Sequence, residues 1–296
     1  GFYRSGSMMS YKQYEPHELR QLQLISTMIL GEFDRICQKL NIDYYVYGGT
    51  AIGTVRHKGF VPWDDDVDIA LFREDYERFM REAPQEMGEA YELVSGRTDP
   101  FFPACNANFS LKNTFCVPEE FAHCPFQYPI GIGLFAMDKP SNDPRTLDRQ
   151  RRMTWFFARL AFLRATPAPH VQLSQPLKGL VLVACYLAHW AMKIFHVSPR
   201  WIHARWEHYA RLAEHEQGET YVDFMDRDPH AWAVTRAEAY PAIRAPFETI
   251  TVNLPKAYDV MLRRGFGDYM QLPPENDRKN HYPSRLDFGP YKDIKE

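Results

Sequence analysis

Residues 64–68 carry four aspartates within five positions, and this cluster is the part of the chain best suited to chemistry. Four carboxylates so close together repel one another unless solvent or a cation neutralises them. A Gly-Gly pair (Gly48 and Gly49) precedes the cluster, and a basic triplet lies between the two. Acids, a glycine turn and cations in one short segment predict a metal-assisted site for a phosphate ester. The competing interpretation, a solvated loop or helix cap, is disfavoured by apolar residues on both sides of the acids.

The flanking elements explain how such a site could be positioned. Residues 42–48 are expected to form a buried strand, and residues 50–57 a short helix that opens at the Gly48-Gly49 turn. The start of that helix would direct backbone N–H groups and a positive dipole end at an anion.

A second strand is expected over residues 67–71. Side chains alternate along a strand, so Asp66 and Asp68 should share one face while Val67 and Ile69 pack into the core. Two carboxylates on one face can share a divalent cation, and Mg²⁺ (or Mn²⁺) suits a site with one or two protein carboxylates plus phosphates. Asp64 is a further catalytic candidate, and Asp64 and Asp65 could hold a second ion, bind water or support the first pair.

Cationic side chains are the candidate phosphate contacts. The triplet Arg56, His57 and Lys58 could contact phosphate or could be an exposed helix end. The run from Arg278 to His281, with Lys279 inside it, could do the same or could be a solvated tail.

The remaining pattern predicts an α/β fold with one mixed sheet. Helices are expected over residues 18–40, 73–83, 144–165, 176–196, 199–216 and 256–267. Strands are expected over residues 91–95, 108–113, 131–137, 221–225 and 247–255, and the late strands are candidates to rejoin the first sheet. The predicted organisation is a cloning remnant (1–8), a core with the metal site (9–142), a helical region (143–217) and a C-terminal part that completes the core and substrate site (218–296).

Composition narrows the functional classes. The chain has 296 residues and a formal net charge of −3, which argues against general nucleic-acid binding. Five cysteines without close pairing suggest a reducing compartment. A zinc site from Cys105, Cys116 and Cys124 with His123 is an alternative, but the spacing fits no common pattern.

Residues 179–188 form a ten-residue apolar run, which raises the question of a membrane contact. It is too short to span a bilayer. We expect a buried helix there, and the alternative is a helix that touches a membrane surface.

The segment GGTAIGTVRHKGFVPWDDDVDIAL resembles the LicD family of cholinephosphotransferases, relatives of the fukutin-type phosphotransferases. The C-terminal stretch LPKAYDVMLRRGFGDYMQLPPENDRKNH is also similar, and the resemblance spans roughly residues 20–290. It implies a nucleotidyltransferase-like fold and transfer of phosphocholine, or a related phospho-alcohol, from a cytidine diphosphate donor to a glycan hydroxyl. It implies metal-binding roles for Asp66 and Asp68, and donor phosphate contacts for Gly48, Gly49 and Thr50.

The chain departs from the family pattern at one place. Where the family commonly has an Asp-Ile-Phe-Pro-Leu-Asp-like strand, this chain reads GLFAMD from Gly133 to Asp138. Asp138 is retained as a candidate substrate contact, and the first acid is replaced by glycine. Glu119, Glu120, Asp64 or a substrate group could take its role.

The quaternary ammonium of choline binds well against aromatic faces. The candidates are Trp63, Tyr45, Tyr47, Phe101 and Phe102, with core packing as the alternative role for most of them. Lys112 could reach a phosphate or be a plain surface lysine.

The expected reaction is therefore attack of an acceptor hydroxyl on the β-phosphorus of CDP-choline, with CMP as the leaving group. The expected acceptor is a bacterial surface-glycan precursor of the lipopolysaccharide, teichoic acid or capsule type, either soluble or lipid-linked. The expected location is the cytoplasm, with the inner membrane face as the alternative. Two rivals remain: a nucleotidyltransferase that attacks the α-phosphorus of a nucleoside triphosphate, and a protein that binds a nucleotide or glycan without turnover.

Overall fold

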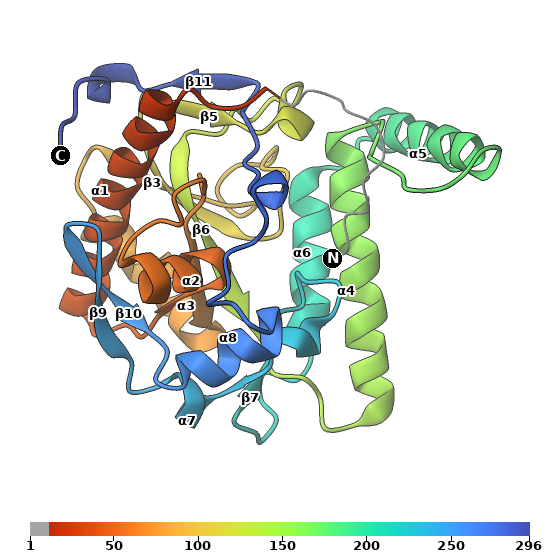
Figure 1. Cartoon of the computed structure of the whole chain (residues 1–296). Helices are drawn as coiled ribbons and strands as arrows, with labels where there is room; N and C mark the ends of the chain where they lie inside the picture. The colour runs from red at the N-terminus through yellow and green to blue at the C-terminus, as the bar shows by residue number, and fades with distance from the viewer. Residues whose placement is uncertain (1–11) are drawn as a thin grey trace.

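The computed structural model describes residues 12–296, and at its centre lies a five-stranded mixed sheet (Figure 1). The strand order is β1 (Tyr45–Val46), β2 (Asp68–Phe72), β6 (Ile130–Met137), β4 (Ala107–Leu111) and β3 (Tyr91–Val94). The pair β2–β6 is parallel, and the other three pairs are antiparallel. The predicted mixed α/β fold is confirmed, while the cloning remnant predicted at residues 1–8 lies outside the described residues.

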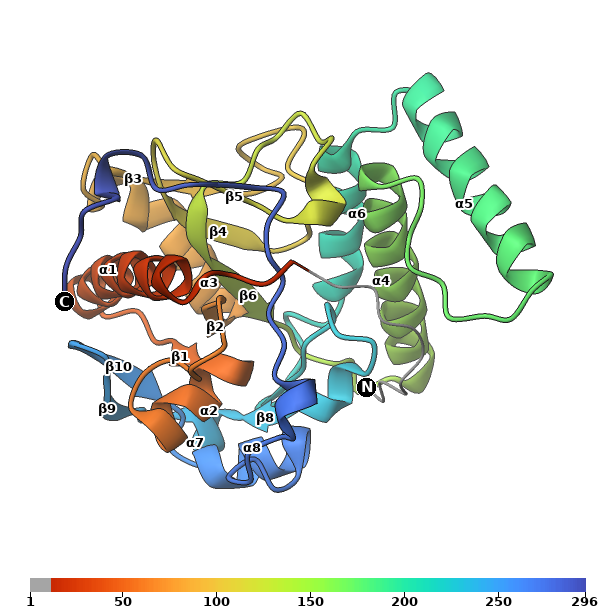
Figure 2. The ribbon, with the colours of Figure 1, turned by 45° about the horizontal axis from the view of Figure 1, so that its top comes forward.

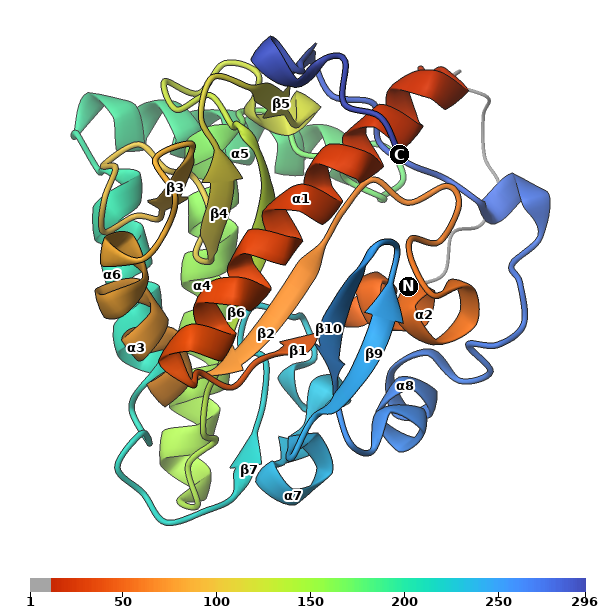
Figure 3. The same cartoon turned by 90° about the vertical axis from the view of Figure 1, so that its left-hand side faces the viewer.

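The two faces of the sheet belong to different cores because strand side chains alternate. Ile69 and Leu71 of β2 pack into a large core with α1 (Pro16–Leu40) and α3 (Arg73–Glu82). The rings of Phe33 from α1 and Phe79 from α3 meet at 4.8 Å, so the two helices lie on the same face. Figure 3 shows α1 crossing the sheet obliquely. Ala70 and Phe72 of β2 face the other way, into a second core with Tyr221 and Val234.

Apart from an isolated bridge between Val222 and Asp138, the late strands do not join the five-stranded sheet, so that expectation is wrong. Strands β9 (Ile243–Phe247) and β10 (Ile250–Leu254) form their own hairpin, β7 (Thr220–Tyr221) pairs with β8 (Val234–Thr235), and β11 (Arg285–Asp287) pairs with β5 (Phe115–Val117). Phe247 and Val252 nevertheless belong to the same core as α1. The C-terminal part thus packs on the sheet without extending it.

Other boundaries also differ from the sequence expectations. The strand expected over 42–48 is only Tyr45–Val46, because the chain then turns into α2 (Gly48–His57). Helices α7 (Arg236–Ala239) and α8 (Tyr258–Phe266) follow in the C-terminal part. Short 3₁₀ segments occupy Ala83–Gln85, Glu119–Phe121, Pro229–Trp232, Glu275–Asp277 and Gly289–Tyr291.

A helical unit of α4 (Pro144–Ala165), α5 (Leu177–Ile194) and α6 (Pro199–Ala210) stands beside the sheet (Figure 2). Helices α4 and α6 each begin with a proline, and the side chains of Asp143 and Ser198 cap them by accepting hydrogen bonds from the backbone N–H groups of Thr146 and Trp201. Helices α4 and α6 share a core that includes Ile202 and Trp206.

The expectation of a buried helix at 179–188 is wrong. The helix is longer, Leu177–Ile194, and it stands away from the body of the protein in Figures 1 and 2. Of its residues only His189 and Met192 are buried. By length and composition alone, this helix of 18 residues could cross a membrane.

Candidate functional site

The start of α2 forms one wall of the site. Tyr47 is its N-cap, and Gly48 has a φ of 56°, a left-handed conformation that favours glycine. A Cβ on Gly49 would lie 3.0 Å from Oδ2 of Asp64, so the acidic loop (residues 59–67) reaches the helix start. The predicted helix opening at the Gly48-Gly49 turn is confirmed.

Hydrogen bonds and close packing fix α2 against β2 and the acidic loop. The Thr50 hydroxyl accepts a hydrogen bond of 2.9 Å from the backbone N–H of Asp68. A Cβ on Gly53 would lie only 2.4 Å from the carbonyl oxygen of Gly59, so no larger residue fits there without movement. Thr50, predicted as a phosphate contact, is buried and also positions Asp68.

Asp64, Asp65 and Asp66 bring carboxylate oxygens within 4.8 Å of one another. Asp68 follows at the first position of β2, and its negative charge, like those of Asp64 and Asp65, acts on the Asp66 carboxylate. Burial raises the pKa of Asp64 to about 6, and burial with the charges of Asp64, Asp223 and Asp65 raises the pKa of Asp68 to about 7. Desolvation and the three neighbouring aspartates raise the pKa of Asp66 well above its ordinary value.

Hydrogen bonding separates these carboxylates into two groups. Asp64 accepts from the backbone N–H of Asp66, and Asp65 accepts from the Tyr14 hydroxyl at 2.8 Å. Within residues 12–296, no hydrogen-bond donor reaches the carboxylates of Asp66 and Asp68. Two crowded carboxylates without donors fit a hard divalent cation such as Mg²⁺ or Mn²⁺.

Asp223 is a fifth carboxylate at this site, and the sequence analysis missed it. It is buried, it accepts a hydrogen bond of 2.7 Å from the Tyr47 hydroxyl, and its charge raises the pKa of Asp68. Burial raises the pKa of Asp223 itself to about 6. The signal available in the sequence was one acid inside the apolar segment YVDFM.

Gly133 lies directly across the parallel ladder from Asp68. A Cβ at this position would lie 3.0 Å from Oδ1 of Asp68 and 3.0 Å from the Phe135 ring, with the Asn106 amide nitrogen at 3.5 Å. The space that an acidic side chain would need is therefore bordered by Phe135 and Asn106. Of the replacements considered, Glu120 acts on Asp66 through its charge.

The C-terminal cationic run packs against the acidic loop, which disfavours a solvated tail. The Arg278 guanidinium lies 5.1 Å from the centre of the Trp63 ring, and the Asn280 amide donates to the Trp63 carbonyl. Burial raises the pKa of Asp65, and the hydrogen bond from Tyr14 and the proximity of His281 offset part of that increase. Lys279 lies between Arg278 and Asn280 in the sequence.

In the basic triplet at the end of α2, Arg56 and His57 make hydrogen bonds within the protein, whereas Lys58 is exposed. Arg56 donates to the Tyr269 carbonyl at 2.6 Å and to the His57 ring at 2.9 Å. Burial and the charge of Arg278 lower the pKa of Arg56, so these two guanidinium groups lie near one another. Lys58 is exposed and ends the helix in a left-handed conformation.

Two predicted site residues lie away from the acidic loop. Lys112 follows β4 at the end opposite Asn108, whose register partner is Gly133, so it stands about 13 Å along the strand from the site. The carboxylate of Asp138 accepts two hydrogen bonds from Arg73, at 2.8 and 2.9 Å, and is buried. Neither side chain therefore adjoins the acidic loop, and their contacts with a substrate stay predictions.

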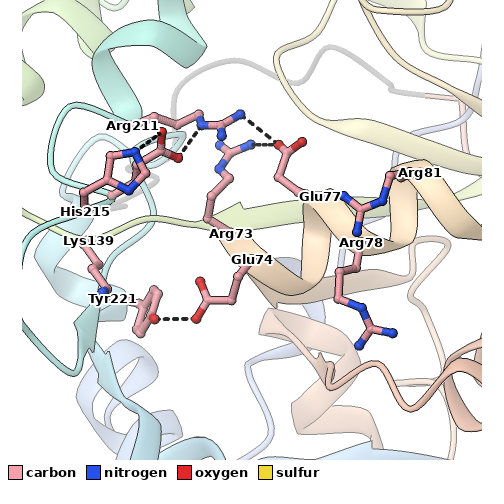
Figure 4. Close-up of a pocket in the computed structure, with 10 residues that line it drawn as sticks. Arg73, Glu74, Glu77, Arg78, Arg81, Lys139, Arg211, His215 and Tyr221 are labelled. Atoms are coloured by element: carbon pink, nitrogen blue, oxygen red, sulfur yellow. Dashed lines mark hydrogen bonds and ion pairs between the residues drawn. The ribbon is translucent and has the colours of Figure 1, made fainter.

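Arg73 also lines a pocket of about 410 Å³ that lies apart from the acidic loop (Figure 4). Arg73 and Arg211 pair with the carboxylates of Glu77 and Glu207, and Tyr221 donates to Glu74. These charges are largely paired with one another, which indicates a structural network. The zinc alternative is likewise disfavoured, because in the described part of the chain its three cysteines form no metal-ligand group.

The aromatic candidates also separate by position. Tyr45 and Phe102 are buried in separate cores, Phe101 is exposed, and one face of Trp63 is covered by Arg278. The ring centre of Tyr47 instead lies 5.9 Å from that of Phe135 and 5.1 Å from that of Trp232. We call Tyr47, Phe135 and Trp232 the aromatic wall. Its Phe135 ring lies beside Gly133, opposite Asp68, and the Tyr47 hydroxyl donates to Asp223.

Comparison with known proteins assigns this site to a class. Residues 41–98, which contain the start of α2, the acidic loop and β2, match a nucleotidyltransferase domain. The family whose model matches these residues is LicD/FKTN/FKRP. The resemblance inferred from the sequence motif is confirmed.

Individual relatives extend the match. The chain is 26% identical over 274 residues to the lipopolysaccharide cholinephosphotransferase LicD of Haemophilus influenzae, covering 89% of this chain and 96% of that protein. It is 35% identical over 157 residues to the uncharacterized protein RP689 of Rickettsia prowazekii, covering 47% and 58% of the two chains. It is 32% identical over 57 residues to the human ribitol 5-phosphate transferase FKRP, covering 19% of this chain and 11% of that protein.

Proposed function

We propose that this chain is a metal-dependent phosphotransferase that moves phosphocholine, or a related phospho-alcohol, from a CDP-linked donor to a hydroxyl of a surface-glycan precursor. The observation that carries the proposal is the pair Asp66 and Asp68. Both carboxylates have raised pKa values and lack donors within residues 12–296. Asp66 is grouped with Asp64 and Asp65 in the loop that adjoins the N-terminus of α2, and Asp68 begins β2 directly after that loop.

A divalent cation held by Asp66 and Asp68 would neutralise phosphate oxygens as charge develops on the leaving CMP. The backbone N–H groups at Gly48 and Gly49 would point at the same anion. Arg56 and Arg278 supply positive charge on the other side of the acidic loop. Asp64, with its pKa near 6, is suited to accept the proton of the acceptor hydroxyl.

The aromatic wall supports a cationic alcohol on the donor. Tyr47, Phe135 and Trp232 are half-buried, Phe135 lies opposite Asp68, and ring faces attract quaternary ammonium groups. Asp223 adds a carboxylate next to the wall through its bond to Tyr47. A neutral alcohol such as ribitol would gain nothing from these charges.

The acceptor and the reaction class draw support from the relatives. The Haemophilus protein, which the chain matches over most of its length, is named for transfer of phosphocholine to lipopolysaccharide, and FKRP for transfer of ribitol 5-phosphate. Both names describe a transferase that delivers a phospho-alcohol. We therefore propose a surface glycan as the acceptor.

A screen of cytidine diphosphate esters tests the proposal. Purified protein is incubated with CDP-choline, CDP-ribitol or CDP-glycerol, with Mg²⁺ or Mn²⁺ and a glycan extract, and CMP is measured. Metal-dependent CMP release that is fastest from CDP-choline is the expected result. Absence of CMP from every ester would overturn the proposal.

A nucleotidyl transfer is the second candidate, and the description of the family domain as a nucleotidyltransferase favours it. In that case a nucleoside triphosphate would release pyrophosphate, and the CDP esters would not react. A protein that only binds is the third candidate, favoured by Gly133 where the family pattern has an acid. Calorimetric binding of a CDP ester without CMP formation would identify it.

A further inference from the structure

Helix α5 presents a continuous apolar stripe to solvent. Leu180, Val183, Leu187, Trp190 and Ile194 follow helical spacing, and their exposed fractions run from 43% to 69%. Phe195, at the end of the helix, is 78% exposed. The surface of a soluble protein rarely exposes so many large apolar side chains in one patch, so this stripe indicates a binding surface.

The surrounding sequence has an unusual charge distribution. Residues 149–206 contain seven arginines and two lysines and no aspartate or glutamate, although the whole chain carries a net charge of −3. Lys178 and Lys193 lie on α5 itself, near its two ends. The partner of this region should therefore be negatively charged, which disfavours a second copy of the same cationic unit.

The attachment of α5 favours a helix lying on a surface over one that crosses a bilayer. The C-terminal part of α5 is held to α4 by the His189 ring and the Leu163 carbonyl at 2.7 Å, and Arg164 donates to the Val197 carbonyl just before α6. Since α4 and α6 pack together, a crossing α5 would require residues 166–176 to cross as well. This segment contains three prolines and no helix or strand, so its backbone polar groups would be unpaired in hydrocarbon.

We propose that α5 binds flat to the surface of an anionic phospholipid bilayer. The stripe from Leu180 to Ile194 enters the boundary between headgroups and acyl chains, and Lys178 and Lys193 remain among the phosphates. The other cations of residues 149–206 add attraction to the negatively charged leaflet. This binding requires neither the donor nor the acceptor of the proposed reaction.

Vesicle flotation tests the proposal with the whole chain. The wild-type protein should float with vesicles made from equal parts of phosphatidylcholine and phosphatidylglycerol, and less with phosphatidylcholine alone. Leu180→Glu/Leu187→Glu should lower the bound fraction about tenfold or more, since two charges enter the apolar stripe. Lys178→Glu/Lys193→Glu should reduce binding and its sensitivity to salt.

Ile243→Glu/Val260→Glu is the matched control, because it places two charges on exposed apolar residues of β9 and α8. It should float as the wild type does. Wild-type protein that stays out of the vesicle fraction, or equal flotation of the Leu180→Glu/Leu187→Glu variant, overturns the proposal. A wild-type dimer that Leu180→Glu/Leu187→Glu converts to a monomer, without flotation, would overturn it in favour of self-association. No donor is present, so these outcomes are independent of the proposed transferase activity.

Discussion

Asp68 and Gly133 face each other across the parallel strands β2 and β6, and a Cβ at residue 133 would lie 3.0 Å from Oδ1 of Asp68. The Phe135 ring lies equally close to that position. The absence of a side chain at Gly133 thus leaves room for the Asp68 carboxylate and for the aromatic wall. Small displacements of Asp68 should affect turnover strongly, because transfer depends on alignment of the reacting groups.

Gly133→Ala is therefore expected to lower kcat about tenfold or more, because either Asp68 or Phe135 must move. The folded protein should lose little stability, and the measurements are steady-state kinetics and thermal unfolding. Gly88→Ala is the control, since its Cβ would make only an ordinary contact of 3.4 Å with Tyr91. Unchanged kcat in Gly133→Ala would show that the position does not bear on the reaction.

Asp66→Asn and Asp68→Asn should each abolish turnover and leave the metal-free protein as stable as before, or more stable. Each change removes one charge from a group of carboxylates that repel one another. Metal-induced stabilisation should disappear together with activity, which calorimetry and thermal unfolding can measure. Asp148→Asn, an exposed aspartate paired with Arg152 on α4, controls for the loss of one surface charge. Activity that survives both site changes would remove Asp66 and Asp68 from the mechanism.

The raised pKa values predict how stability depends on pH. The folded protein holds protons on Asp64 up to about pH 6 and on Asp68 up to about pH 7, whereas an unfolded aspartate titrates near about 3.9. Between about pH 4 and pH 7 the folded state therefore binds more protons. The free energy of unfolding of the metal-free protein should fall as pH rises through this window, apart from contributions of other groups, and this loss should level off above it.

Divalent cations should reverse that loss, because they bind the ionised carboxylates. The increase in Tm on adding Mn²⁺ should accordingly be larger at pH 8 than at pH 5. Asp66→Asn/Asp68→Asn should show a smaller increase at both values. An increase that is the same at pH 5 and pH 8 in the wild type would contradict a carboxylate site.

Local patterns predicted the parts of the site that are close in sequence. The Gly48-Gly49 start of α2 and the inward packing of Val67 and Ile69 followed from turn chemistry and alternation, and both are confirmed. Asp223 was missed because it arrives through the backbone bridge between Asp138 and Val222, and pairing of distant segments leaves no local signal. The position of Lys112 relative to the acidic loop was open for a related reason, since the register of β4 decides which end of the strand meets the loop.

The apolar composition of residues 179–188 predicted burial, yet composition alone does not determine whether the rest of the protein covers a helix. In the structure α5 meets α4 mainly through its C-terminal part, and most of its apolar side chains face solvent. The two late strands β9 and β10 illustrate the same limit. Their pattern identified them as strands, while the choice between the main sheet and a separate hairpin depended on tertiary packing.

The ion pair of Arg73 and Asp138 supplies the last prediction. Both side chains are buried, so Arg73→Met would leave an unpaired carboxylate in the interior and should cost about 3–5 kcal/mol in the free energy of unfolding. Arg73→Met/Asp138→Leu should recover most of that loss, because the second change removes the stranded charge. Arg152→Met on α4 is the control, since its pair with Asp148 is exposed and should cost at most about 1 kcal/mol. Urea unfolding measures all three variants, and CMP release per folded molecule should stay near the wild-type value in the double variant. A double variant that folds stably but no longer turns over would return Asp138 to the substrate site.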